Sequence, residues 1–222
     1  MSQAKERPIL FSAPMVRAIL EGRKTVTRRA AKVQPRSKGD IGSYGLGQPF
    51  IRHPESTKRN PECPYGRPGD RLWVRETHKI ATGKVGDIQA SVRYEADGDY
   101  QAKVMPQPEA IGARTFERTR PSIHMPRWAS RILLEITDVR VERLQDGEGE
   151  TDFESRYVAE GIHRIHHGDG EHYYHPFKSE PGPGNWADPF DAWRELWVSI
   201  NGADSWNANP WVWVVEFKQV AA

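Results

Sequence analysis

One long alternating segment constrains the fold of this chain more than any other feature. Residues 132–143 read Ile-Leu-Leu-Glu-Ile-Thr-Asp-Val-Arg-Val-Glu-Arg, with Leu134 and Ile136 on one side and Glu135 on the other. Alternation with a period of two predicts a β-strand, and the phase slip near Val139 predicts a bulge or a bend. A long bent strand is what a small barrel needs in order to close.

Further strands and helices are predicted along the rest of the chain. Short β-branched or alternating runs predict strands at residues 8–11, 24–28, 71–76, 92–95 and 211–217. Apolar residues at helical spacing, with capping residues and terminal glycines, predict helices at residues 13–21, 152–159 and 189–201. Since helices mostly do not join the strands, we expect an α+β protein, a small mixed β-barrel flanked by about three helices.

The length of the chain fits one domain that carries insertions. The chain has 222 residues, and domains have roughly 150, so we expect one domain over residues 1–222. Three stretches without periodicity are too long for ordinary connections. They are interpreted as inserted loops, at about residues 34–69, 97–120 and 163–187.

The composition excludes several classes of protein. No apolar run approaches the roughly 18 residues of a membrane span. Residues 1–8 are polar, so we expect a cytoplasmic protein with no membrane partner. The single cysteine, Cys63, excludes an internal disulfide, and no disulfide partner is expected.

The net charge of +2 hides a local excess of positive charge. Between Arg17 and Lys38 there are eight basic residues and one acidic residue, Glu21. A segment this basic attracts partners that carry phosphate, although the same composition is typical of a solvated surface. Both interpretations stay open at the level of sequence.

A cluster of histidines lies in the third inserted loop. Imidazoles at such spacings can ligate zinc, but no cysteine or close pair of carboxylates accompanies them. We therefore expect a solvated loop, no metal and no other cofactor. The histidines are His163, His166, His167, His172 and His175.

The most informative motif is Glu-Gly-Arg-Lys-Thr-Val-Thr-Arg at residues 21–28. It lacks the first glycine and the Gly-Lys-Thr register of a phosphate-binding loop, so that motif is rejected. As a strand, the segment places Lys24 and Arg28 on one face and Thr27 on the other unless the backbone bends.

This motif and several other segments resemble the ASCH domain family. Members of the family begin with a short helix, followed by Gly-x-Lys-Thr and then a threonine and an arginine, as residues 22–28 do here. The resemblance covers about half of the chain and extends to residues 68–76, 123–131, 136–144, 159–162, 190–200 and 209–214. The whole arrangement is similar to the longer ASCH proteins that bacteriophages and prophages often encode.

The resemblance implies a fold and a class of ligand. ASCH domains have a β-barrel of the PUA-like kind, with a cleft that binds RNA, nucleotides or nucleosides. Some members are amidohydrolases that remove an acetyl group from the exocyclic amine of acetylated cytidine with a lysine, a threonine and a glutamate. At least one other member behaves as a ribonuclease. In this chain the resemblance places the three catalytic residues at Lys24, Thr27 and Glu160.

The chemistry of amide hydrolysis suits these three residue types. The reaction needs a nucleophile, a base, and an acid that protonates the leaving nitrogen. A threonine hydroxyl and a desolvated lysine can supply the first two, and a carboxyl group the third. The alternative is a noncatalytic RNA- or DNA-binding module, or a ribonuclease, in which Lys24 and Arg28 contact phosphate.

Further residues are candidates for binding a nucleoside, a nucleotide or RNA, with DNA as an alternative. Trp73 and Trp128 lie in arginine-rich segments, where an exposed ring can stack on a base, although core packing is the other interpretation. The candidate binding residues are Arg23, Arg28, Arg29, Trp73, Arg75, Glu76, Arg127 and Trp128.

Overall fold

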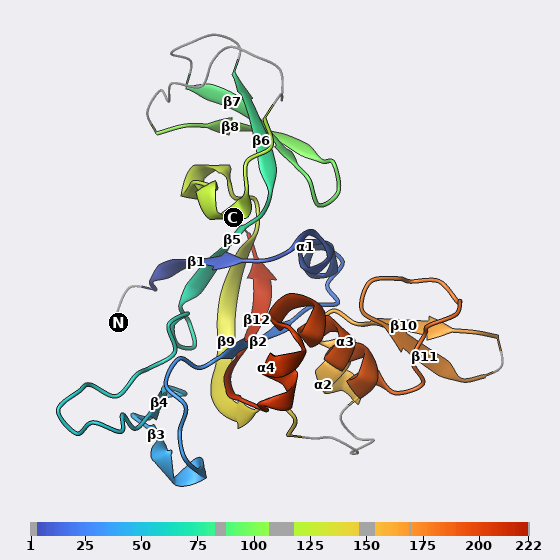
Figure 1. Ribbon diagram of the computed structural model, residues 1–222. Coiled ribbons are helices and arrows are strands. Elements are labelled where there is room, and N and C mark those ends of the chain that lie inside the picture. Colours follow the sequence, from blue (N-terminus) through green and yellow to red (C-terminus); the bar gives the residue numbers. More distant parts are fainter. Residues whose placement is uncertain (1–3, 83–87, 107–117, 147–153, 169, 222) are drawn as a thin grey trace. The chain divides into compact units, whose positions relative to one another are not determined.

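The computed structural model describes residues 4–82, 88–106, 118–146, 154–168 and 170–221 (Figure 1). Over these ranges the chain forms twelve strands and four α-helices, so the α+β class expected from the sequence is confirmed. The chain divides into two compact units. The first unit comprises residues 1–20, 70–135 and 219–222, and the second comprises residues 21–69 and 136–218.

The first unit contains both parallel and antiparallel strand pairs. Strand β1 (Glu6–Leu10) runs parallel to β5 (Arg71–Arg75), and β5 pairs antiparallel with the beginning of β9 (Leu133–Arg143). Helix α1 (Ala13–Leu20) follows β1 and buries Met15, Val16, Ala18 and Ile19. The spacing of these apolar residues is that of an amphipathic helix, as the sequence predicts.

A three-stranded antiparallel sheet is the other part of the first unit. Its order is β6 (His78–Thr82), β7 (Gln89–Tyr94) and β8 (Tyr100–Val104). Short 3-10 turns, η2 (Ser122–His124) and η3 (Arg127–Ala129), follow in the chain. Strand β8 lies in a stretch that the sequence analysis interprets as irregular, and at β8 that prediction is wrong. Its sequence alternates, but Tyr100, Ala102 and Val104 form the exposed face while Gln101 and Lys103 are half-buried, so the apolar residues do not mark a face that packs on a core.

Strand β12 (Trp211–Val220) organises the second unit. It pairs antiparallel with β2 (Val26–Ala30), and its other neighbour in the sheet is β9. Residues 211–215 are all buried, so both faces of β12 are covered. The strands in the described ranges do not close into a barrel.

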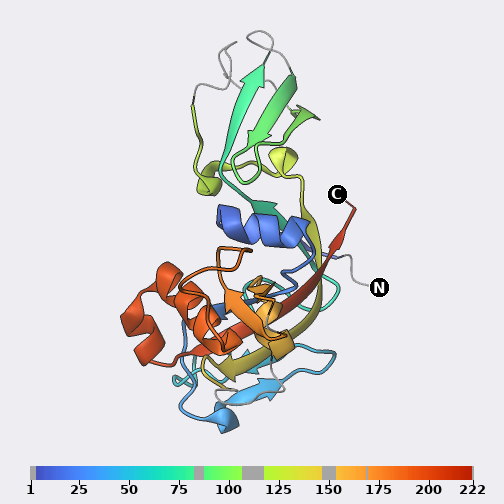
Figure 2. The same ribbon diagram turned by 90° about the vertical axis from the view of Figure 1, so that its right-hand side faces the viewer.

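Helices α2 (Glu154–Val158), α3 (Pro189–Asn201) and α4 (Ala203–Asn207) lie together in the second unit (Figure 2). An aromatic cluster joins them, because the ring centres of Tyr157 and Trp206 lie 5.4 and 5.3 Å from that of Trp193. Aromatic pairs at such distances stabilise a fold beyond the area that they bury. The cluster therefore fixes the end of α2, and Glu160 follows that end directly.

Two hairpins complete the second unit. One pairs β3 (Ile41–Ser43) with β4 (Pro49–Ile51) after the 3-10 turn η1 (Lys38–Asp40), and the other pairs β10 (His163–His166) with β11 (His172–His175). The sequence analysis interprets both stretches as irregular, and for these residues the prediction is wrong. In the second hairpin, Ile165 and Tyr174 are buried while most of the surrounding histidines are not, so the polar residues concealed the strand pattern.

Helix α3 begins and ends where its sequence predicts. Asp188 accepts a hydrogen bond from the Phe190 N–H at 2.8 Å, Pro189 occupies the first turn, and Gly202 follows the helix with a φ of 82°. The residues predicted to start the preceding helix, 151–153, lie outside the described residues. Among the helices that the structure describes, none combines the length and the apolar character that crossing a bilayer requires.

Replacing Asp188 with Ala tests the contribution of the α3 cap. We expect the free energy of unfolding to fall by about 1 kcal/mol, because the Phe190 N–H loses its side-chain acceptor. Chemical denaturation followed by tryptophan fluorescence measures the change. Asp204→Ala is the control, because this exposed acid contributes only a helix-dipole effect of about 0.3 kcal/mol. Equal losses in the two variants would contradict the role of the cap.

Candidate functional site

Two segments that are far apart in the sequence meet beside β2. Lys24 forms an isolated antiparallel bridge with Glu160, and the Thr25 N–H donates to the Ala159 carbonyl at 2.9 Å. Gly161, with a φ of 100°, turns the chain directly after Glu160, a conformation that glycine adopts without strain. The backbone therefore holds Lys24 and Glu160 opposite each other.

The carboxylate of Glu160 is held between two cationic side chains. Lys24 Nζ donates to Glu160 Oε2 at 2.8 Å, and Arg28 Nη1 donates to Oε1 at 2.7 Å. The side chains of Lys24, Arg28 and Glu160 are only 2%, 3% and 5% exposed, so water screens their charges weakly. We call these three residues the buried ion cluster.

Burial and neighbouring charges shift the protonation of the buried ion cluster. Burial lowers the pKa of Lys24, Glu160 opposes this, and Arg29 and Arg28 act in the same direction as burial, so the pKa lies below its ordinary value. Burial acts to raise the pKa of Glu160, but the charges of Lys24 and Arg28 outweigh it and hold that pKa below its ordinary value. Glu160 is therefore ionised at neutral pH, and Lys24 releases its proton more readily than a lysine in water.

Arg28 links the buried ion cluster to a larger group of charges. Its Nη2 lies 4.0 Å from Glu142 Oε2, and its guanidinium carbon lies 5.3 Å from the ring centre of Trp193. Glu142 also accepts hydrogen bonds from Arg140 Nε at 2.6 Å and from Arg156 Nη2 at 2.7 Å. The sequence analysis did not select Glu142. The sequence does contain a signal, because Asp138, Arg140 and Glu142 stand at alternate positions of β9 and therefore lie on one face of the strand.

Thr27 lies on the face of β2 opposite to Arg28. Thr27 stands across from Val215 and Arg28 across from Val214, and successive side chains of a strand point to opposite faces. Thr27 is buried, and no hydrogen bond among the described contacts joins its hydroxyl to Lys24 or Glu160. Of the three residues predicted to be catalytic, the structure thus brings Lys24 and Glu160 together, with Arg28 as the third member of the group.

Two other arginines, Arg23 within the motif and Arg29 directly after it, lie close to the buried ion cluster. Arg23 donates to the carbonyl of Gly161 and pairs with Glu21 at 2.6 Å. Arg29 is half-buried and stands across from Trp213 on β12. Arg23 thereby supports the turn that follows Glu160, whereas Arg29 lies on the same face of the strand pair as Trp213.

The aromatic candidates for base stacking belong to the first unit. The guanidinium carbon of Arg75 lies 5.5 Å from the ring centre of Trp73, so the two side chains pack on each other. Trp128 is half-buried and packs against the core of the three-stranded sheet. Both tryptophans have a structural contact, and both keep some exposed surface.

The charged candidates of the first unit take part in ion pairs. Glu76 accepts from Arg131 Nε at 2.9 Å and from Arg131 Nη2 at 3.0 Å, and both side chains are almost fully buried. Arg127 pairs with Glu6 at 2.8 Å in a more exposed position. The geometry of Glu76 is that of a structural ion pair, whereas Arg127 stays accessible.

The histidine hairpin holds pairs of imidazoles. His166 and His172 face each other across the strands, with ring centres 5.5 Å apart. His175 Nδ1 accepts from the backbone N–H groups of Phe177 and Lys178. In the part of the chain that the structure describes, no three His, Cys, Asp or Glu side chains gather as a metal site would need.

The absence of a tightly bound zinc in this hairpin stays a prediction. Elemental analysis of protein purified without a histidine tag should find well under one metal ion per chain. One zinc per chain, lost when His163 and His167 are replaced, would contradict it.

Comparisons with known proteins give no match to this chain, whether with protein-family models, with curated proteins or with solved structures.

Replacing Glu160 with Gln tests the energetics of the buried ion cluster. We expect a loss of about 3–5 kcal/mol in the free energy of unfolding, because two buried cations lose their counter-charge. The pKa of Glu160 is lower in the folded chain than its ordinary value of 4.5. The stability that this shift contributes is therefore present above pH 4.5 and lost as the pH falls through the folded pKa.

Denaturant titrations at a series of pH values measure both effects. The wild type should lose stability steeply below pH 4.5, and Glu160→Gln should show a smaller slope there. Glu180→Gln, which alters an exposed acid, is the control and should keep the wild-type slope. Identical acid profiles in wild type and Glu160→Gln would argue against the ion cluster.

Proposed function

We propose that this protein is an ASCH-type amidohydrolase that acts on the exocyclic N-acyl group of a cytidine-like nucleoside or nucleotide. The observation that carries the proposal is the contact between Lys24 and Glu160. The family resemblance selects these two residues from motifs 136 positions apart, and their side chains meet at 2.8 Å. A PUA-like barrel belongs to the same proposal.

The directions of the pKa shifts favour particular roles for the two residues. Glu160 is ionised at neutral pH, so in this proposal its carboxylate accepts the proton of the nucleophile. Lys24, whose pKa is lowered, donates a proton to the leaving nitrogen. This assignment reverses the roles that the sequence suggests. Arg28 holds the second oxygen of Glu160 and keeps the carboxylate ionised.

The bonds and protons balance in this sequence of steps. The nucleophile oxygen adds to the acyl carbon while Glu160 takes its proton, the carbon–nitrogen bond breaks, and the amine leaves with a proton from Lys24. Transfer of the proton from Glu160 to Lys24 across their contact then restores the ionised carboxylate and the protonated amine. The nucleophile is the Thr27 hydroxyl, as the resemblance implies, or a water molecule, which the position of Thr27 on the opposite face of β2 favours. If Thr27 attacks, the acyl group stays on its oxygen as an ester. Water then adds to the acyl carbon, its proton passes by way of Glu160 to the leaving Thr27 oxygen, and the carboxylic acid is released.

A noncatalytic RNA- or DNA-binding module is the second candidate function. The exposed cations Lys32, Arg36 and Lys38 favour it, and the side chain of Arg36 is 81% exposed. A ribonuclease that uses Lys24 and Arg28 on phosphate has less support, because both side chains are bound to Glu160.

Lys24→Arg tests the amidohydrolase directly. Arginine keeps a positive charge for Glu160 but does not release a proton near neutral pH. We expect kcat/KM for acetylated cytidine to fall by about 100-fold or more, a typical contribution of proton transfer. Lys38→Arg is the matched control on an exposed lysine and should keep the wild-type rate. Thermal unfolding of each variant separates lost chemistry from lost folding.

Thr27 variants identify the nucleophile. If the hydroxyl attacks, Thr27→Ala should be as slow as Lys24→Arg, and Thr27→Ser should keep part of the rate; if water attacks, both should stay close to wild type. A wild-type protein that does not hydrolyse acetylated cytidine or its nucleotides, even at enzyme concentrations near that of the substrate, would contradict the amidohydrolase and favour the binding module.

A further inference from the structure

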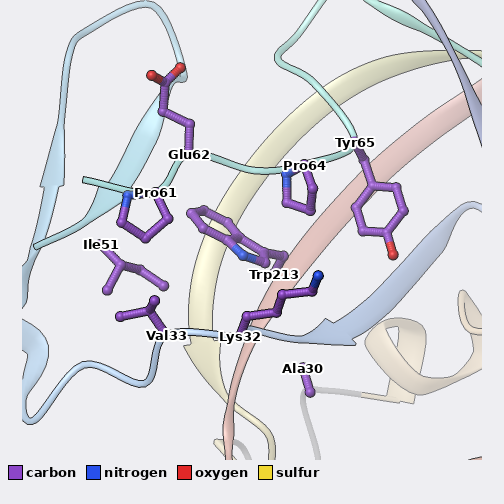
Figure 3. Close-up of a pocket in the computed structure, with 9 residues that line it drawn as sticks. All are labelled: Ala30, Lys32, Val33, Ile51, Pro61, Glu62, Pro64, Tyr65 and Trp213. Atoms are coloured by element: carbon purple, nitrogen blue, oxygen red, sulfur yellow. The ribbon is translucent and has the colours of Figure 1, made fainter. Parts of the chain in front are cut away.

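A hollow of about 210 Å³ in the second unit lies on the other face of the β2–β12 pair (Figure 3). Trp213 lines it and stands across from Arg29, so its indole lies on the face opposite to Arg28 and Glu160. The hollow is thus separate from the buried ion cluster. Its volume suits one planar ring system, because pockets for larger ligands start at about 300 Å³.

The walls of the hollow are mostly apolar. Figure 3 shows the indole of Trp213 at the centre, with Pro61 on one side and Pro64 and Tyr65 on the other. Val33 and Ile51 complete the apolar lining. Flat aromatic walls of this kind bind a planar ring by stacking.

The Trp213 indole N–H gives the hollow a hydrogen-bond donor. In the part of the chain that the structure describes, this N–H donates to no protein atom. A planar ligand with an acceptor at its edge can therefore satisfy it. This N–H is not among the buried polar atoms that lack a partner, so water can also reach it. A ligand that displaces this water replaces its hydrogen bond if it is a heteroaromatic ring with an acceptor, and a hydrocarbon does not.

The charge at the margin of the hollow is positive. Glu62 lines the hollow, but its carboxylate accepts hydrogen bonds from Gln48 and Arg59 and points away from Trp213 (Figure 3). Lys32 also lines the hollow, and no carboxylate of the described residues lies within ion-pair distance of its Nζ. A ligand that carries an anionic group next to its ring therefore fits this margin.

We propose that this hollow binds one nucleotide, with the base against Trp213 and Tyr65 and the phosphate beside Lys32. A planar heteroaromatic ring joined to an anion is the chemistry of a free nucleotide and also of a nucleotide within an RNA chain. Because the hollow and the buried ion cluster lie on opposite faces of the strand pair, the proposal does not depend on amidohydrolase activity.

The 222-residue chain is titrated with nucleoside monophosphates, with the corresponding nucleosides and with a short single-stranded RNA. Calorimetry gives the affinities, and the indole N–H resonance that Trp213→Phe removes reports on the hollow itself. Lys32→Gln should weaken monophosphate binding by about tenfold and leave nucleoside binding unchanged, because only the phosphate contacts Lys32. Lys178→Gln, on an exposed lysine that does not line the hollow, should change neither.

A second variant fills the hollow without removing a buried residue. Val33 lines the hollow and is half-buried, so the larger side chain of Val33→Trp should fill the hollow, abolish binding and leave the fold intact. Binding of RNA much tighter than that of monophosphates, lost in the same variant, would identify an RNA chain as the source of the nucleotide, and equal affinities would identify the free nucleotide.

Three results would overturn the proposal. The first is no binding of any nucleotide or RNA up to millimolar concentrations. The second is equal weakening of binding by Lys32→Gln and Lys178→Gln, and the third is undiminished binding by Val33→Trp. Glu160→Gln separates this proposal from the amidohydrolase, because a folded variant without hydrolysis should still bind nucleotide in the hollow.

Discussion

The second unit depends on the burial of one carboxylate between two cations. Glu160 receives Lys24 on one oxygen and Arg28 on the other, and all three side chains are almost excluded from water. Each charge alone would cost several kcal/mol to desolvate, and together they satisfy one another. Removal of any one of the three side chains would deprive a buried charge of a partner, so the three residues stabilise the fold together. Their contacts also join the end of α2 to the beginning of β2. The same desolvation lowers the pKa of Lys24, so the feature that holds the fold also produces a reactive amine.

Strand β2 separates two chemical environments by simple alternation. Its Arg28 face carries the buried charges, and its other face carries Thr27 and Arg29 beside Trp213. One face thus has groups that can move protons, whereas the other has flat apolar walls with a cation at their margin. The alternation of side chains along β2 (Val26–Ala30) therefore explains how one short strand contributes residues to two separate sites.

The sequence predicted the elements whose pattern is strong and local. The long alternation of β9, the capped amphipathic α3 and the helical stripe of α1 all follow from periodicity and terminal residues. The meeting of Lys24 with Glu160 followed from the resemblance, because nothing in local periodicity relates positions so far apart. The motifs around Lys24 and Glu160 thus indicated a long-range contact, which secondary-structure propensities do not indicate.

The elements that the sequence did not predict are short and rely on contacts elsewhere in the chain. The β10–β11 hairpin has two buried anchors, Ile165 and Tyr174, among histidines and glycines, so its alternation falls below the level of a local signal. The position of Thr27 relative to Lys24 depended on whether the backbone bends before β2, and side-chain pattern alone does not decide that. Glu142 was missed because charges on a strand are normally solvated, and only the fold brings Arg28 and Arg156 to it.

The second unit is assembled from residues far apart in the sequence, and this separation has a consequence for the synthesis of the chain. The hydrogen bond from Gln34 to Trp211, just beyond β2, joins residues 177 positions apart, and a ribosome that adds about 5–20 residues per second needs roughly 10–35 s to cover that distance. During this interval β2 has no partner strand, and its Arg28 remains hydrated until Glu160 emerges, about 50 residues before Trp211. A hydrated, charged strand is a poor template for pairing with other chains. The charges that end up buried therefore also protect the nascent chain from aggregation while it waits for its partner.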